Sequence, residues 1–158
     1  MANQNKFFLT KEGLSRIENE YKELKKLKSF KTKGESPRIF HSEEIDPEFL
    51  AFQEDLELLD TRVIELENIL KNVQLITAPP KEKRDVIGLG ATVLVEVDGQ
   101  TDEFVIVGTL ETNPDIGKIS TESPIGKALL GHKAGEEVVI SSPTKVTYKI
   151  IKIKYPSL

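Results

Sequence analysis

Four carboxylates lie close together near the middle of the chain, and their type and spacing could support chemistry. They are Glu43, Glu44, Asp46 and Glu48. Carboxylate oxygens are preferred ligands of Mg²⁺, so acids crowded at one end of a hairpin could share such an ion or orient water around it. The same acids also suit a helix start, where each stabilises the first turn by about 0.3–1 kcal/mol. Because exposed, flexible carboxylates hold Mg²⁺ weakly, any chemistry would need further groups from another molecule.

A basic stretch precedes these acids. Residues 22–38 hold seven basic and two acidic side chains, whereas residues 43–60 hold eight acids and no base. A basic stretch followed by an acidic one would flank the tip of a hairpin. The lysines could hold a phosphate backbone, or they could form an ordinary solvated helix face.

Other kinds of chemistry find little support in the sequence. The 158 residues carry a net charge of −4 and include no cysteine, so disulfides and thiolate sites are excluded. The two histidines, His41 and His132, have no partner at metal-ligand spacing, and no nucleophile elbow or glycine-rich phosphate loop is present. The apolar run at Phe7–Leu9 is too short for a signal sequence or a membrane span, so we expect a cytoplasmic protein.

A long helix that begins directly after the acids is the element expected to position them. Asp46 can cap it, Pro47 suits its first helical position, and Glu48 favours the positive end of its dipole. Its apolar residues alternate at steps of three and four, which is the heptad pattern of a coiled-coil seam. The seam residues are Phe49, Phe52, Leu56, Leu59, Val63, Leu66, Leu70 and Val73. The pattern predicts a helix over residues 47–74, roughly 40 Å long.

A partner helix is predicted over residues 11–29, capped by Thr10. Its apolar positions are Leu14, Ile17, Tyr21, Leu24 and Leu27. The connection over residues 30–46 is broken by glycine and proline and is too short for a parallel return, so the two helices should run antiparallel. Gly13 costs about 1 kcal/mol relative to alanine in a helix, and the sequence suggests no reason for it beyond close packing.

The second half of the chain changes from helical to strand periodicity. Strands are predicted over residues 91–97, 103–107, 138–140 and 146–153. Asp98-Gly99 is typical of a tight hairpin turn, and Ser123-Pro124 can begin a short helix that Gly131 ends. We therefore predict an α+β fold. An antiparallel coiled-coil hairpin spans residues 1–76, a linker 77–84, and a mostly antiparallel β domain with one short helix 85–158.

The β domain resembles a known family. Residues 88–138 are similar to the bacterial transcript-cleavage factors GreA and GreB, above all in the block SPIGKALLG at Ser123–Gly131, followed by Lys133, Gly135 and Val138. Further similar residues are Gly90–Val93, Ile106–Gly108, Glu111 and Ile119–Glu122. The N-terminal half is similar more loosely, through Leu9-Thr10, Glu12-Gly13 and Asn68–Asn72.

This resemblance implies a coiled coil joined to an FKBP-like domain that docks on RNA polymerase at the rim of its secondary channel. The coiled coil would enter the channel, and two tip acids would help to hold a second Mg²⁺ in the polymerase active site, where backtracked RNA is cleaved near its 3′ end. The chain would be a monomeric factor and not itself an enzyme, with no Mg²⁺ bound stably on its own. RNA-contacting residues would be Lys25, Lys28, Lys31, Lys33 and Arg38. Polymerase-contacting residues would be Ser123, Pro124, Ile125 and Lys127.

The tip departs from the family pattern. A gapless match on Phe49 places Ser42 and Ile45 where the family has its two acids. A shift by one residue restores acids three residues apart, as Glu43 and Asp46, which we predict to be the catalytic and Mg²⁺-binding pair. Glu44 and Glu48 are their substitutes.

Two alternatives remain open. The divergent tip is compatible with a factor that occupies the channel as an inhibitor or regulator without stimulating cleavage. A prolyl isomerase or chaperone is a third hypothesis, although the β domain offers only Phe104, Tyr148 and Tyr155 for an aromatic pocket.

Overall fold

The computed structural model describes residues 6–33, 47–141 and 144–156. The chain divides into two compact units. The helical unit is Ser15–Asn72, and the sheet unit joins the residues up to Leu14 to those from Val73 onward. This division differs from the limit that we drew after residue 76, because the start of the chain pairs with Val73–Leu75 inside the sheet unit.

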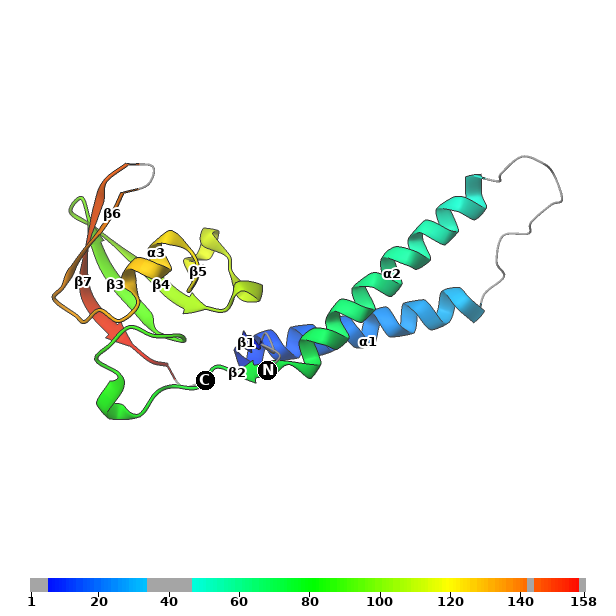
Figure 1. The fold of residues 1–158 in the computed structure, drawn as a ribbon, viewed down its shortest axis with the longest axis horizontal. Helices are drawn as coiled ribbons and strands as arrows, with labels where there is room; N and C mark the ends of the chain where they lie inside the picture. The colour runs from blue at the N-terminus through cyan, green and yellow to red at the C-terminus, as the bar shows by residue number, and fades with distance from the viewer. Residues whose placement is uncertain (1–5, 34–46, 142–143, 157–158) are drawn as a thin grey trace, which may run out of the picture. The chain divides into compact units, whose positions relative to one another are not determined.

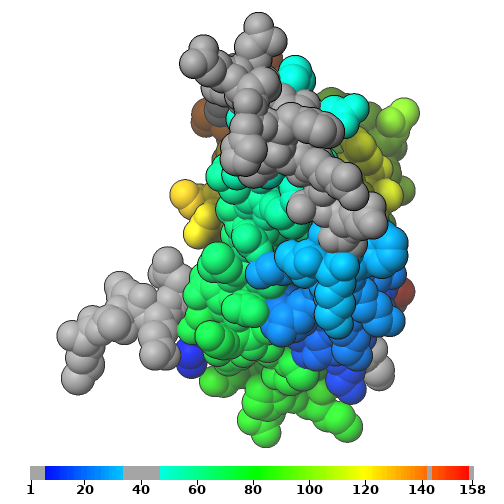
Figure 2. Space-filling model, turned by 90° about the vertical axis from the view of Figure 1, so that its right-hand side faces the viewer, coloured from blue at the N-terminus to red at the C-terminus, as the bar shows by residue number. Residues whose placement is uncertain are grey.

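Two long helices make up the helical unit and lie side by side (Figures 1 and 2). They are α1, Lys11–Lys33, and α2, Pro47–Lys71. The predicted seam faces inward: Leu59, Val63 and Leu66 are buried, and the other seam residues of α2 are half-buried. Lys28 of α1 pairs with Asp60 of α2, and the later Lys31 pairs with the earlier Asp55, which confirms the antiparallel arrangement.

A short parallel sheet lies at the start of the sheet unit. Its strands are β1, Phe7–Leu9, and β2, Val73–Leu75, with Phe7 paired to Val73. The N–H of Ile76 donates to the carbonyl oxygen of Leu9 over 2.8 Å, and Leu9 is completely buried. Val73, predicted as the last seam residue of the long helix, is therefore in a strand. Strands of three residues, far apart in the chain, carry no readable periodicity.

The main sheet has five strands in the order β5-β4-β3-β7-β6. Their bounds are β3 Thr92–Val97, β4 Gln100–Val107, β5 Lys118–Ser120, β6 Glu137–Ile140 and β7 Val146–Lys154. All neighbours are antiparallel except β4 and β5, and β5 was not predicted from the sequence. The Asp98-Gly99 turn between β3 and β4 is confirmed, since both residues have positive φ, 51° and 78°.

A single core fills the sheet unit. Val93 and Val95 of β3 are completely buried, as are Ile106 and Ile150 of the neighbouring strands. The helix α3, Pro124–Leu129, adds the fully buried Leu129 to this core. The predicted combination of a helical hairpin with a mostly antiparallel sheet and one short helix is therefore confirmed.

Candidate functional site

Three of the four predicted acids, Glu43, Glu44 and Asp46, lie outside the described residues. Glu48 is exposed in the first turn of α2, where its charge faces the positive end of the helix dipole. Within the described ranges, no group of three or more histidine, cysteine, aspartate or glutamate side chains could hold a metal ion. The pair Glu43 and Asp46 therefore stays a prediction from the sequence.

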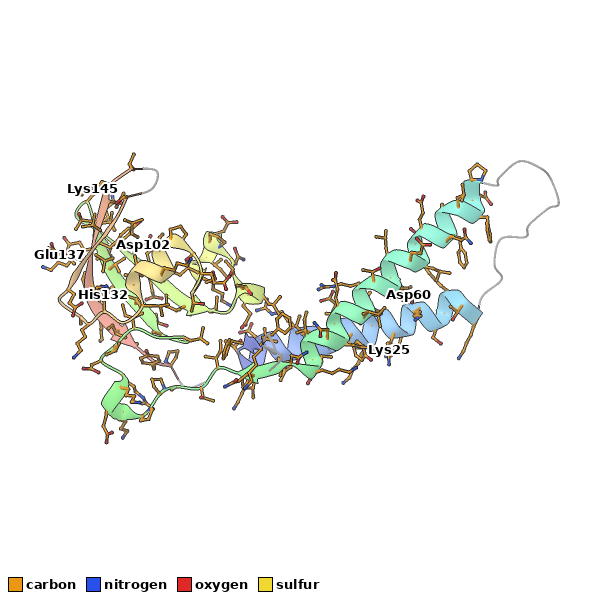
Figure 3. The ribbon with its side chains drawn as sticks, in the orientation of Figure 1. Lys25, Asp60, Asp102, His132, Glu137 and Lys145 are labelled. Carbon is orange, nitrogen blue, oxygen red and sulfur yellow. The ribbon has the colours of Figure 1, made fainter. Side chains whose placement is uncertain are left out.

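The predicted RNA-contacting lysines do not all share one surface. Lys28 pairs with Asp60 of α2 at 2.5 Å, and Lys31 pairs with Asp55 at 3.6 Å. Figure 3 labels Lys25 on α1 and Asp60 on α2. Lys25 lies over the ring of Tyr21, 4.8 Å from its centroid, and Tyr21 raises the pKa of Lys25, mainly as a hydrogen-bond partner. Lys33 is exposed, and Arg38 lies outside the described residues.

The sequence held a signal for this division. Continuing the heptad of α1 beyond Leu24 by steps of four and three leads to Lys28 and Lys31, which are therefore seam positions. Lys22 and Lys26 fall between the seam positions and are exposed. Heptad positions would thus have separated lysines that face α2 from lysines that face solvent, whereas our prediction grouped them by proximity in the chain.

Hydrogen bonds between polar side chains also stabilise the helical unit. The Arg62 guanidinium donates to both carboxylate oxygens of Glu20, over 2.7 and 3.0 Å, and to Glu65 over 3.2 Å. These acceptors raise the pKa of Arg62, with Glu20 the main cause. The Tyr21 hydroxyl donates to Glu67 over 2.9 Å. The two helices are thus joined at several points along their length.

The residues predicted to contact the polymerase have mixed roles. The Ser123 hydroxyl caps α3: it accepts from the N–H of Gly126 over 3.0 Å and donates to the carbonyl oxygen of Ser120 over 2.8 Å. Ile125 packs against the core. Pro124 and Lys127 are exposed. Ser123 and Ile125 therefore shape the α3 surface, and Pro124 and Lys127 are the two that project from it.

The aromatic residues Phe104, Tyr148 and Tyr155 of the β domain do not line one shared pocket. Phe104 is buried and packs edge-on against Tyr148, with ring centroids 6.2 Å apart. The Tyr155 hydroxyl donates to the carbonyl oxygen of Val86 over 2.6 Å, and burial raises the pKa of Tyr155. Tyr155 lines a pocket of about 320 Å³ to which neither Phe104 nor Tyr148 contributes. This arrangement gives no aromatic cage of the kind that our isomerase alternative needs.

Comparisons with known proteins fit these features. The family described as "Transcription elongation factor, GreA/GreB, C-term" matches residues 81–155. The chain is 37% identical to transcription elongation factor GreA of Listeria welshimeri over 158 residues, covering 97% of this chain and 98% of the relative. The chain belongs to the GreA/GreB family. GreA of Thermomicrobium roseum is also 37% identical, over 85% of this chain and 88% of the relative.

Solved structures of this family are also similar. The GreA factor homolog 1 (Gfh1) of Thermus thermophilus aligns over 95% of this chain and 99% of its own, with a TM-score of 0.42 and 27% identity. A GreA/GreB factor from Nitrosomonas europaea aligns over 95% and 98%, with a TM-score of 0.44 and 18% identity. As for membranes, the helices in the described part of this GreA/GreB-family chain are all too short or too polar to span one.

Proposed function

We propose that this chain binds RNA polymerase through its sheet unit and stimulates the polymerase to cleave backtracked RNA. The observation that carries the proposal is membership of a family of transcription elongation factors, at 37% identity over nearly the whole chain. The active site belongs to the polymerase in this proposal, so the chain is a factor and not itself an enzyme. In this proposal, the chain binds the polymerase at the rim of the polymerase's secondary channel and contacts the RNA 3′ end. It acts in the cytoplasm.

The helical unit supports this proposal by its length and its bracing. The 25 residues of α2 extend about 37 Å at the usual helical rise. Pairing of Arg62 with Glu20 and of Lys31 with Asp55 joins α2 to α1 at two levels of the hairpin. A braced pair of helices keeps the position of its tip better defined than a single helix of that length would.

Glu43 and Asp46 are the residues that we assign to the cleavage step, with Glu44 and Glu48 as substitutes. They are three residues apart in the sequence, and Asp46 directly precedes Pro47, the first residue of α2. Two carboxylates are suited to sharing a Mg²⁺ whose other ligands come from the polymerase and to accepting hydrogen bonds from the attacking water. The metal would polarise the scissile phosphate and lower the pKa of that water.

The test uses stalled, backtracked elongation complexes. We expect the wild-type chain to shorten the transcript, and the pair Glu43→Ala with Asp46→Ala to abolish this activity while still competing with the wild type for polymerase. A matched control is Glu54→Ala with Glu57→Ala, two exposed acids of α2 that are also three residues apart. Cleavage that persists in the tip variant and equals that of the control would refute the assignment of Glu43 and Asp46.

The divergent tip sequence favours one second candidate, a factor that occupies the channel without stimulating cleavage. The same assay separates the two functions. A wild-type chain that competes for polymerase and slows transcription, yet never shortens the RNA at any Mg²⁺ concentration, would select the inhibitor.

A further inference from the structure

The first turn of α1 has an incomplete cap of its own. The Thr10 hydroxyl accepts a hydrogen bond from the N–H of Gly13 over 3.0 Å, which is the first half of a capping box. In a complete capping box, the third helical residue is a glutamate or glutamine whose side chain reaches back to the N–H of the capping residue. That residue here is Gly13, which has no side chain to offer.

Glu111, which ends the short 3₁₀ turn η2 (Thr109–Glu111), supplies the missing half. One carboxylate oxygen accepts from the N–H of Thr10 over 2.8 Å, and the other accepts from the Thr10 hydroxyl over 2.5 Å. A Cβ atom on Gly13 would overlap the Glu111 carboxylate. The glycine therefore leaves room for a glutamate that is 101 residues away in the chain to complete the cap.

The backbone just before η2 also packs closely against the start of the chain. Gly108 is buried one residue before η2, and a Cβ atom there would overlap the carbonyl oxygen of Phe8 in β1. β1 is itself paired with β2. Of these contacts, the one from Glu111 acts directly on the start of α1, because Glu111 accepts hydrogen bonds from both the N–H and the hydroxyl of Thr10.

We propose that Glu111 is a positioning residue for the hairpin, an inference that rests on the proposed function. α1 starts inside the sheet unit and continues without a break into the helical unit. A carboxylate that holds the first turn of α1 restricts the directions in which the rest of the helix can swing. In this proposal, Glu111 restricts the positions that the predicted acids can take relative to the reacting phosphate while the sheet unit is bound to the polymerase.

The decisive variant separates the cap from the connection. In Gly13→Glu combined with Glu111→Ala, the sequence from Thr10 to residue 13 becomes a complete local capping box, so the start of α1 stays capped but is no longer joined to η2. The single change Glu111→Ala removes the connection and the half of the cap that Glu111 supplies, and it leaves the hydrogen bond from Gly13 to the Thr10 hydroxyl in place. Thr10→Ser keeps a hydroxyl and an N–H for Glu111, and Glu103→Ala removes an exposed carboxylate elsewhere on the sheet unit.

Two measurements decide the proposal. The chain has no native cysteine, so spin labels can be placed at Asn19→Cys on α1 and Thr101→Cys on β4, both exposed, and the distribution of distances between them can be recorded. The second measurement is the transcript-cleavage rate as a function of factor concentration. Circular dichroism of each variant checks that it is folded.

We expect Glu111→Ala and the double variant to broaden the distance distribution relative to the wild type. Their maximal cleavage rate should fall about tenfold or more, because misplacing reacting groups by about 1 Å can cost ~10²-fold. The half-saturating concentration should stay within about twofold, since the docking surface is intact. Thr10→Ser and Glu103→Ala should behave as the wild type.

A double variant with the distance distribution of the wild type would overturn the proposal, and so would one with an unchanged maximal rate beside an active wild type. If the wild-type chain itself fails to cleave RNA, the proposed function fails, and the distance distribution alone then decides whether Glu111 restricts α1.

Discussion

Replacing Gly13 with alanine should destabilise the protein, although the same change stabilises most helices. In a helix interior, alanine is favoured over glycine by about 1 kcal/mol. Here the new methyl group overlaps the Glu111 carboxylate, which must move away from the N–H and hydroxyl of Thr10. The glutamate is flexible, so the cost comes from its lost hydrogen bonds to Thr10, and hydrogen bonds to a charged group contribute about 1.5–3 kcal/mol. Taking about 2 kcal/mol for that loss leaves a net destabilisation of about 1 kcal/mol.

The sign should reverse when the glutamate is absent. In a Glu111→Ala background, the methyl group at residue 13 meets no carboxylate, so Gly13→Ala should stabilise by about 1 kcal/mol. The four proteins of this double-mutant cycle thus give a coupling energy of about 2 kcal/mol between the two positions. Each 1 kcal/mol corresponds to a shift of about 2–4 °C in Tm for a chain of this size.

Thermal unfolding followed by circular dichroism measures all four proteins under one condition. The control is Ser15→Ala, at an exposed position of the same helix, which should shift Tm little in either background. If Gly13→Ala raises Tm equally with and without Glu111, the carboxylate does not occupy the space beside Gly13, and the account of this residue is wrong.

Three further predictions concern the rest of the molecule. Leu66→Ala should cost about 2–5 kcal/mol in chemical denaturation, since Leu66 is completely buried in the hairpin seam. Arg62→Met should cost no more than about 1 kcal/mol, because Arg62 and Glu20 are both about 40% exposed, and the cost should shrink as salt is added. His132 lowers the pKa of Glu136 from its ordinary 4.5 by hydrogen bonding over 2.6 Å, so His132→Asn should return that pKa, followed by NMR, toward 4.5. A carboxyl group whose folded pKa is lowered contributes stability that is present above the unfolded pKa and is lost as the pH falls through the folded pKa. The variant should lose the part of this acid dependence that His132 causes, while Lys133 keeps its own smaller effect.

Local signals in the sequence predicted most of the fold. The heptad of α2, the Asp98-Gly99 hairpin and the Ser123-Pro124 helix start depend on residues close together in the chain, and the structure has all three. The strands β1, β2 and β5 were missed because each has three residues and pairs in parallel with a strand to which no tight turn connects it. Length and periodicity give no information on such pairings.

The contact between Gly13 and Glu111 could not be predicted from local sequence signals either. Gly13 had no explanation in the sequence, because the group that requires it comes from η2 in the other half of the chain. Thr10, Gly13 and Glu111 all belong to the stretches that resemble GreA and GreB. Two separate parts of the resemblance therefore meet at one point of the structure, where they build a helix start.

Side chains of α2 become more buried from Pro47 toward Lys71, and this affects how easily each part of the hairpin can open. All four buried residues of α2 lie in its second half: Leu59, Val63, Leu66 and Ile69. From Phe49 to Leu56 the seam residues of α2 are only half-buried, and ion pairs from Lys31 to Asp55 and from Lys28 to Asp60 lie beside this part of the seam. Half-exposed ion pairs contribute at most about 1 kcal/mol each to stability. Apolar burial is thus deepest in the part of the hairpin nearer Lys71, whereas half-buried side chains and ion pairs hold the part nearer Pro47. Local opening should therefore cost less free energy near Pro47 than near Lys71.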